Sequence, residues 1–429
     1  MLVVIISSGL FMLGTKSEEV WVYTISVDTL NHNNYGLTYP VTYVFSIPNI
    51  QNLVAYKKYN LTEDWVRLPE KFKGELFNGI EAVRFDYDVK KAYVSVTFGP
   101  YSDKIYVKIA DSSGITVPAN FIGISDYYDN RKAVVACTID DVGIPPTNTE
   151  FLKISEVFSN AQVWWTPAIV TKGSNVNWSV YQTGINMGFL EIASHSRNHP
   201  HVPYSNYTSE IGGSKSDIIN NLDLPYKKDT KDYVWCWVEP FGESDGTVRQ
   251  KLGEYKYLIS RQVGRTEGPT FWAEWDVNNN HYSRALVSVK IDDETLEKIN
   301  AAFDKAYANG GIYHIYGHVG ASIGWNAGEK GYEHIKYIKG KTDIWYVGFG
   351  HLYVYHYTQK IISVAPPSVQ MVETQLMLSV PSSIQAGNSF QVSGKLTGVY
   401  KPLSSYPTLK GAIEGGQIRL TASWGEVKT

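Results

Sequence analysis

The chain has 429 residues, a formal net charge of −3, and acidic and basic residues that are interspersed along its length. A chain of this length holds two or three domains with a substantial core. The charge pattern contains no basic stripe, which argues against a nucleic-acid-binding protein, and no acidic run that is typical of a disordered tail.

Residues 1–16 contain the apolar run "MLVVIISSGLFMLG", which is too short to span a bilayer. The run is typical of the hydrophobic part of a signal peptide, although the basic residues that usually precede it are missing. We therefore expect a remnant signal peptide and an extracellular or cell-surface protein; a buried first strand is the alternative. Three N-x-S/T sequons, at Asn60, Asn177 and Asn206, are compatible with export.

Two cysteines are too few for a disulfide framework. Cys137 and Cys236 both lie in apolar, strand-like runs, so we expect buried free thiols. Aromatic residues make up 14% of the chain, and 31 residues are tyrosine. This composition is typical of a β-rich protein, and it also fits an aromatic surface that binds sugars.

Residues 17–117 contain strand-like segments separated by turn residues: "VWVYTISV", "VTYVFSIP", "EAVRFDYDV", "KAYVSVTFG" and "KIYVKIAD". We expect a β-sandwich that folds on its own, with carbohydrate binding as one interpretation of its role. Strand and helix patterns alternate over 118–362, beginning with the continuous apolar segment "KAVVACTI", which predicts an α/β layer fold or barrel. We interpret 363–375 as a Pro-containing linker and 376–429 as an incomplete immunoglobulin-like β module.

Histidines are few in this chain, and three of the ten fall inside "ASHSRNHPH". His195 and His199 lie four residues apart, which on a helical turn places both imidazoles on one face, able to share a metal. Two histidines alone are a weak signal, because exposed polar residues show the same spacing by chance. The preceding segment "FLEIAS" delivers His195 at the carboxyl end of a strand, where α/β folds place their sites.

A second strand, "ACTI", ends in Asp140 and Asp141. Adjacent carboxylates are costly at a strand end unless a cation or a proton offsets their repulsion. Two histidines and one aspartate leave positions open for water on a divalent metal, and the second aspartate is then free to act as a base.

"TIDDVG" resembles the first motif of the polysaccharide deacetylases (carbohydrate esterase family 4), and "EIASHSRNHPH" resembles their second motif, H-S/T-x-x-H-P. The resemblance covers about residues 120–362. It implies a distorted (β/α) barrel, a divalent metal, usually zinc, and an acetylated polysaccharide or oligosaccharide as substrate. It also implies that Asp141, His195 and His199 bind the metal and that Asp140 is the general base for the attacking water.

The third motif departs from the family pattern. "WVEPFG" stands in its place and would supply the backbone N–H of Phe241 to the oxyanion. The family usually has an arginine in this motif that orients the base, and this chain has Val238 and Glu239 instead. Arg261 or Arg265 could supply the charge from another strand end.

The fourth and fifth motifs are matched loosely and well, respectively. "FWAEWDVNN" makes Trp275 and Asp276 candidate pocket residues, and a tryptophan buried in an ordinary strand is the alternative. Ile315-Tyr316-Gly317-His318 matches the L-x-x-H motif, so the resemblance makes His318 the general acid. We expect His314, four residues earlier in the strand, to be a core histidine.

We therefore expect a metal-dependent hydrolase that removes acetyl groups from a polysaccharide, with N-acetyl favoured over O-acetyl. The alternative is a weakly active or non-catalytic glycan-binding or envelope protein of the cell surface, built on the same barrel. The altered third motif favours this alternative, and the intact aspartates and histidines favour the enzyme. We expect no nucleic-acid partner and no membrane span in this chain. Further cell-surface modules are possible partners.

Overall fold

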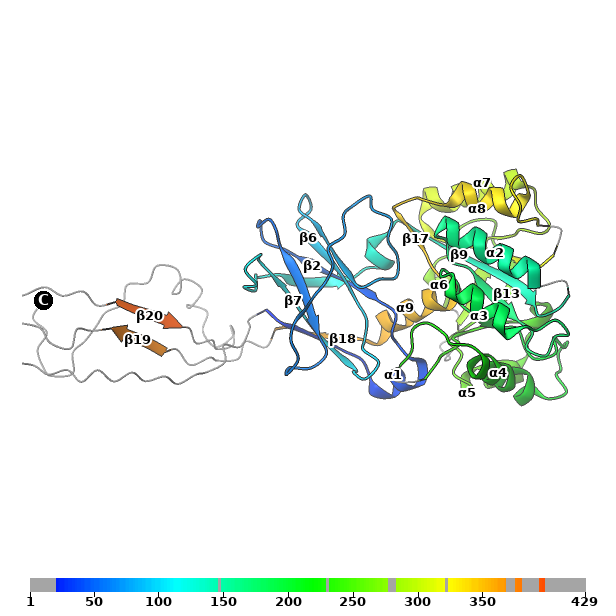
Figure 1. Ribbon diagram of the computed structural model, residues 1–429, viewed down its shortest axis with the longest axis horizontal. Coiled ribbons are helices and arrows are strands. Elements are labelled where there is room, and N and C mark those ends of the chain that lie inside the picture. The colour runs from blue at the N-terminus through cyan, green and yellow to red at the C-terminus, as the bar shows by residue number, and fades with distance from the viewer. Residues whose placement is uncertain are drawn as a thin grey trace, which may run out of the picture. The chain divides into compact units, whose positions relative to one another are not determined.

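The computed structural model describes residues 21–145, 148–228, 231–276, 283–320 and 323–367, and two further strands at 375–379 and 393–397. The described residues fall into two units, one over 24–364 and one that contains 21–23, 365–367 and the two further strands. Figure 1 shows the elements of the first unit. In the second unit the described strands β19 (Gln375–Ser379) and β20 (Ser393–Thr397) pair antiparallel. The expected signal peptide at 1–16 and most of the expected module at 376–429 lie outside the described residues.

The amino-terminal part of the first unit contains two sheets, with the strand orders β18-β1-β7-β3-β4 and β5-β6-β2-β8. The strands of these sheets are β1 (Tyr23–Ser26), β2 (Val41–Ser46), β3 (Val54–Lys58), β4 (Val66–Arg67), β5 (Ala82–Asp86), β6 (Lys91–Val96), β7 (Lys104–Ala110), β8 (Asn120–Ile124) and β18 (Ser363–Ala365). The helices between them are α1 (Thr29–Tyr35) and the short η1 (Tyr128–Asn130). The five strand segments expected from the sequence correspond to β1, β2, β5, β6 and β7.

The expected boundaries of this β region differ from those of its sheets. β8 pairs with β2, so one sheet extends beyond residue 117. β18, which follows the barrel in the sequence, joins the other sheet beside β1. The barrel also contacts this region directly, since Trp345 Nε1 donates to the hydroxyl of Tyr39 at 3.3 Å and Trp235 Nε1 donates to the carbonyl of Tyr35 at 2.5 Å. Residues 24–364 therefore pack as one unit.

A parallel sheet follows, with the order β14-β13-β12-β11-β10-β9-β16-β15, and β17 also pairs with β9. Its strands are β9 (Ala133–Val142), β10 (Thr166–Ile169), β11 (Ala193–Ser194), β12 (Cys236–Val238), β13 (Ile259–Arg265), β14 (Ser283–Val287), β15 (Val289–Lys290), β16 (Gly311–His318) and β17 (Ile344–Tyr346). The helices between them are α2 (Asn148–Ala161), α3 (Trp178–Asn186), η2 (Thr208–Gly213), α4 (Ser214–Asn221), η3 (Pro240–Gly242), α5 (Gly246–Glu254), α6 (Trp272–Trp275), α7 (Leu296–Asn309), α8 (Lys330–Ile338) and α9 (Phe349–Ile361).

One extended segment closes this sheet. β14 pairs with β13, and after Ser288 the same segment continues as β15 and pairs with β16. The backbone N–H of Ser288 donates to the carbonyl of His314 in β16 at 2.7 Å. With β14 and β15 counted as one strand and β17 left out, the strands form a nearly closed parallel barrel of seven, as expected for the α/β part of the chain. Helices α3, α2, α8 and α7 pack against one another in that order around it (Figure 1).

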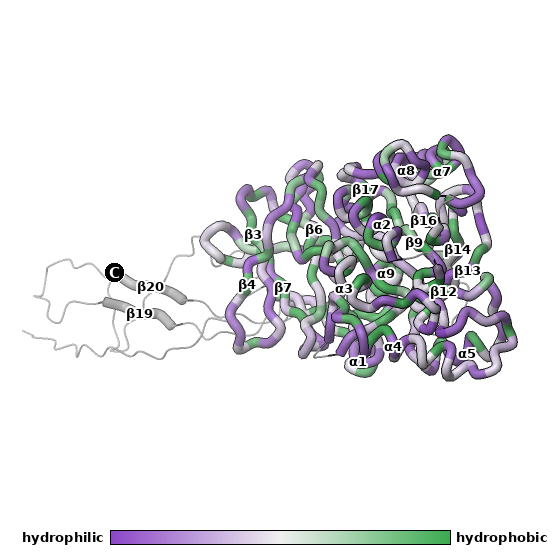
Figure 2. The backbone as a smooth tube through the Cα atoms, turned by 45° about the vertical axis from the view of Figure 1, so that its right-hand side comes forward, coloured by the Kyte–Doolittle hydropathy of each residue, from purple (hydrophilic) through white to green (hydrophobic). Residues whose placement is uncertain are grey.

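The barrel strands are deeply buried. β9 is buried along nearly its whole length, as its continuous apolar sequence predicts. Cys137 and Cys236 are buried free thiols, so that prediction is confirmed. Figure 2 shows the hydropathy of the barrel and of the amino-terminal sheets along the backbone. Among the described residues, no helix has the length and apolar character needed to cross a membrane.

Candidate metal centre

The barrel brings the two predicted motifs to one edge. β9 ends in Asp140 and Asp141, and β11 leads directly into His195. Both strands pair in parallel with β10, which lies between them, so their carboxyl ends meet on the same side of the sheet. The backbone N–H of His195 extends the ladder by donating to the carbonyl of Ile169 at 2.9 Å.

The turn that carries His199 is not helical, so the two imidazoles are brought together by another backbone conformation. Ser196 and His199 have φ angles of 69° and 55°, in the left-handed region that non-glycine residues seldom adopt. The N–H of His199 donates to Ser196 Oγ at 2.8 Å, and this bond closes the turn. Asp141 and Phe241 also have positive φ, at 63° and 55°. Unfavourable backbone conformations gathered in this way are typical of sites whose side chains must point in fixed directions.

Three side-chain atoms form a small triangle at this edge. His195 Nε2 and His199 Nε2 lie 3.1 Å apart, and Asp141 Oδ1 lies 3.5 Å from the first and 3.4 Å from the second. Asp141 Oδ1 is buried and faces the two imidazoles. Tetrahedral zinc, with bonds of about 2.0–2.1 Å, holds its donors roughly 3.3–3.4 Å apart. The triangle therefore has the size and the donor types that such an ion requires, and Asp141, His195 and His199 would hold it.

The surroundings keep these ligands in the form that binds a metal. His195 Nδ1 lies 2.8 Å from the carbonyl of Val238, so it carries the proton and Nε2 keeps its lone pair for the triangle. Burial, and then the neighbouring His195, lowers the pKa of His199 to about 4, so this imidazole is neutral. Burial raises the pKa of Asp141, but the hydrogen bond and charge of His195 outweigh it and leave the pKa below its ordinary value. His199 is thus neutral and Asp141 ionised at neutral pH, which are the forms that bind a metal.

Arg261 lies next to the predicted base. Its Nη2 donates to Asp140 Oδ2, and the side chains of both residues are almost completely buried, with exposures of 0% and 4%. Arg261 is directly opposite Val238 in the register of β12 and β13. The third motif on β12 has no arginine, and the guanidinium beside Asp140 comes instead from the adjacent strand β13. Arg265, the other candidate, forms a partly exposed pair with Glu294 at 3.4 Å instead.

His318 approaches the site from the end of β16. Its Nε2 lies 4.0 Å from Asp140 Oδ2. The carboxylate of Asp292 hydrogen-bonds to the ring Nδ1 of His318 and accepts from its backbone N–H at 3.1 Å. Burial lowers the pKa of His318, but the hydrogen bond with Asp292 and the charges of Asp140 and Asp292 outweigh it and raise the pKa above its ordinary value. His318 thus has an anchored Nδ1 and an Nε2 directed at the base.

The other predicted pocket residues divide between two places. The ring of Phe241 lies beside the triangle, 4.3 Å between centroids from His199, and stacks on His201 at 3.6 Å. Trp275 is fully buried, donates to Thr270 at 2.8 Å and packs on His314. The structure therefore places Trp275 in the barrel core.

Asp276 also belongs to another cluster. Its carboxylate accepts from Tyr353 and His356 of α9, both at 2.7 Å, and pairs with Lys360 at 3.2 Å. These contacts attach α6 to α9 and do not involve the triangle. Trp275 and Asp276 are thus not brought together with the metal-binding candidates.

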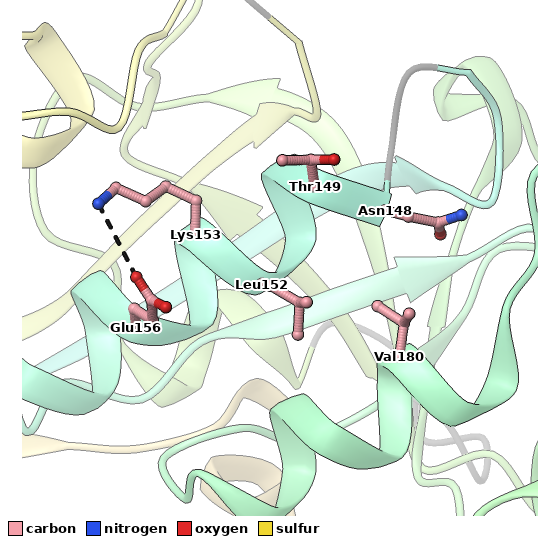
Figure 3. Close-up of a pocket in the computed structure, with 6 residues that line it drawn as sticks. All are labelled: Asn148, Thr149, Leu152, Lys153, Glu156 and Val180. Carbon is pink, nitrogen blue, oxygen red and sulfur yellow. Dashed lines mark ion pairs between the residues drawn. The ribbon is translucent and has the colours of Figure 1, made fainter.

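Asp292 belongs to none of the motifs recognised in the sequence. A signal for it exists, because "VSVKIDD" ends a strand in a carboxylate just as "ACTIDD" does. A surface pocket over α2 and α3 is drawn in Figure 3. Its charged groups are Lys153 and Glu156, which pair with each other at 3.8 Å, and it shares no residue with the candidate site.

No protein-family model matches the chain, and neither does any curated protein. The solved structures to which the chain is similar include polysaccharide deacetylases and members of carbohydrate esterase family 4. One is a family 4 carbohydrate esterase from Streptomyces lividans in complex with acetate, at 16% sequence identity and a TM-score of 0.34, covering 50% of this chain and 91% of that chain. A family 4 acetyl xylan esterase from Clostridium thermocellum in complex with a cobalt ion has 16% identity and a TM-score of 0.34, covering 51% and 90%. The peptidoglycan deacetylase PdaC from Bacillus subtilis has 15% identity and a TM-score of 0.36, covering 54% and 94%.

Proposed function

We propose that this chain is a divalent-metal-dependent hydrolase that removes acetyl groups from a polysaccharide, with N-acetyl groups favoured. The observation that carries the proposal is a buried carboxylate, Asp140, which directly precedes Asp141 of the triangle in β9 and lies 4.0 Å from Nε2 of His318. When bound, a divalent ion at the triangle acidifies water and polarises a carbonyl group. The two nitrogens and one oxygen of the triangle suit zinc.

Asp140 is the general base of this proposal. Its Oδ2 is occupied by Arg261, which fixes the orientation of the carboxylate, and its Oδ1 is buried without a hydrogen-bond partner. Oδ1 is therefore the atom that accepts the proton of the attacking water. Arg261 is the residue that we propose for the role that the third motif leaves open, and its pair with Asp140 supports the enzyme over the non-catalytic alternative.

His318 is the general acid. Asp292 holds its Nδ1, so Nε2 is the atom that donates a proton to the leaving group. The raised pKa of His318 keeps the imidazole protonated closer to neutral pH than in an ordinary histidine. An amine leaves only when it is protonated, whereas an alkoxide depends on protonation less, so this acid supports the preference for N-acetyl groups. The backbone N–H of Phe241 is the proposed oxyanion donor.

The location remains part of the proposal. The apolar run at 1–16 and the sequons support an extracellular or cell-surface protein, where a polysaccharide substrate would be met. We also propose that the β module at 376–429 connects the barrel to further cell-surface modules.

Acetate release from N-acetylated and O-acetylated oligosaccharides tests the function. We expect release with zinc, none after chelation, and a loss of roughly 10²–10⁴-fold in kcat for Asp140→Asn, since a positioned base contributes that much. The control is Asp293→Asn, which removes a half-exposed carboxylate that pairs with Lys290. Metal-loaded protein that binds these oligosaccharides without releasing acetate would support the non-catalytic alternative.

A further inference from the structure

The five-stranded sheet of the amino-terminal region has two chemically different faces. In the register of β3 with its neighbours, Tyr56 is opposite both Arg67 of β4 and Lys108 of β7, and Lys58 is opposite Tyr106. Side chains of directly opposite residues, and of every second residue along a strand, share a face. These five side chains therefore lie on one face.

The other face is the core side. Ile105, Val107 and Ile109 alternate with the first set along β7, and their exposures are 0%, 0% and 2%. Lys57 of β3 also points to this side, where it is buried and pairs with Glu81 at 2.5 Å. The face with Tyr56 and Lys58 is thus the outer face of the sheet.

A tryptophan lies over this outer face. The ammonium groups of Lys58 and Lys108 are 4.4 and 4.6 Å from the centroid of the Trp65 ring, and Lys108 is also 5.1 Å from that of Tyr56. Lys108 is only 4% exposed, which shows that the aromatic rings cover it. These cation–π contacts hold Trp65 in place beside β3 and β7. The outer face then presents three half-buried aromatic side chains: Tyr56, Trp65 and Tyr106.

The charged residues within the strands of this surface are all cations, and the nearby acidic residues Glu63, Asp64, Glu70 and Asp103 lie outside these strands. The strands β3, β4 and β7 contain no aspartate or glutamate, although the whole chain has a net charge of −3. The bordering turn residue Glu63 is bound to Asn60 and to the N–H of Tyr59, and Asp103 accepts from Thr29. The cations of the outer face are Lys58, Arg67, Lys104 and Lys108, of which Arg67 and Lys104 are exposed.

We propose that this basic aromatic face, on β3, β4, β7 and Trp65, binds an anionic polysaccharide at a site distinct from the metal centre (Figure 2 shows the three strands). The aromatic rings supply flat apolar surfaces that match the apolar faces of sugar rings. The exposed cations pair with carboxylate or phosphate groups carried by the polymer. A neutral glycan would not use the exposed cations Arg67 and Lys104, and a polyanion without exposed sugar faces would leave the aromatic rings unused.

Binding to the purified full chain carrying His199→Ala tests this site without hydrolysis. The probes are an oligogalacturonate, a neutral xylo-oligosaccharide and a duplex DNA of equal charge to the first, each titrated by calorimetry. We expect the oligogalacturonate to bind about tenfold or more tighter than the other two, and its affinity to fall as salt is raised. A phosphate-bearing glycan as a fourth probe decides which anion is preferred.

Matched variants locate the binding surface. Arg67→Glu/Lys104→Glu should weaken oligogalacturonate binding by about tenfold or more. The control Lys298→Glu/Lys336→Glu makes the same change in net charge at barrel lysines that are 71% and 60% exposed, and it should leave binding unchanged.

The aromatic contribution is tested separately. Trp65→Ala should weaken binding while the melting temperature stays within a few degrees. The control Phe72→Ala removes an aromatic ring that is 66% exposed and lies outside these strands. Equal affinity for duplex DNA, no binding of either the oligogalacturonate or the phosphate-bearing glycan, or equal effects of the two charge reversals would each overturn the proposal. Because the metal ligand is absent throughout, none of these outcomes depends on the hydrolytic function.

Discussion

The guanidinium of Arg261 pairs with the carboxylate of Asp140 in the interior of the barrel, across 121 positions of sequence. Tyr316 lies against the same guanidinium, with its ring centroid 4.5 Å from the Arg261 Cζ atom. The pair is excluded from solvent, so each charge depends on the other.

Replacing Arg261 by Met should therefore destabilise the protein. Removal of one partner from a buried pair typically costs about 3–5 kcal/mol, because the remaining charge stays buried and unpaired. Denaturant unfolding should show a loss of this size, and kcat should fall with it. The double variant Asp140→Asn/Arg261→Met should regain much of the stability, whereas Arg265→Met, at a partly exposed pair, should change it by about 0–1 kcal/mol. A loss of stability no larger than that of Arg265→Met would show that the buried pair stabilises the fold no more than a partly exposed pair does.

His199→Ala should abolish binding of one divalent ion per chain. The variant removes one corner of the triangle, and two remaining ligands hold zinc poorly. Metal content after dialysis, measured by plasma emission, gives the stoichiometry. His201→Ala is the matched control, because His201 is two residues away and instead contacts Glu243 at 3.1 Å. Full metal retention in His199→Ala would exclude the triangle as the binding site.

His318→Ala should lower kcat sharply, most of all for amides, whose leaving group must be protonated. His314→Ala should leave kcat within a few-fold and lower the melting temperature, because His314 is fully buried and its Nε2 lies 3.2 Å from Thr138 Oγ1. Measuring both quantities for both variants separates the roles. The reverse pattern would assign the acid to His314.

Asp292→Asn should move the alkaline limb of the activity profile to lower pH. The hydrogen bond and the charge of Asp292 raise the pKa of His318, and a general acid works only while protonated. Activity of the wild type should therefore fall as the pH rises through this raised pKa, and the fall should come earlier without the carboxylate. Asp293→Asn should leave the limb in place. The linked stability has the same sign, since the His318–Asp292 contribution is complete below the unfolded-state pKa and is lost as the pH rises through the folded-state pKa.

Glu191→Gln should stabilise the protein increasingly as the pH rises. Glu191 is buried and accepts from the N–H groups of Gly350 and His351 at 2.9 and 3.1 Å, and burial raises its pKa to about 8. The folded state therefore holds a proton that the unfolded state loses near its ordinary pKa, and the stability of the wild type declines between the two values. A neutral glutamine has no such dependence. Unfolding free energies at pH 5 and pH 9 give the comparison, and a pH-independent difference between the two proteins would contradict it.

Several features of this protein could be predicted from the sequence because they are local. The apolar run of β9 indicates a strand covered on both sides, and the residues after it and after β11 place carboxylates and imidazoles at strand ends. Parallel strands align these ends, so the residue pattern alone predicted a site of two histidines and an aspartate. The choice of Asp141 over Asp140 as the ligand, and of His318 as the acid, came from the resemblance to the deacetylase motifs. The burial of the thiols followed from the apolar runs that contain them.

Other features depended on which strands lie side by side. Arg261 reaches Asp140 because β13 is the neighbour of β12 and places Arg261 opposite Val238, and Asp292 reaches His318 because β15 closes the barrel onto β16. Strand order and register result from packing and closure of the whole barrel, to which residues far apart in the sequence contribute, so no local pattern encodes them. For the same reason the sequence could not decide whether Trp275 lines the pocket or lies in the core, and only the tertiary structure places it in the core.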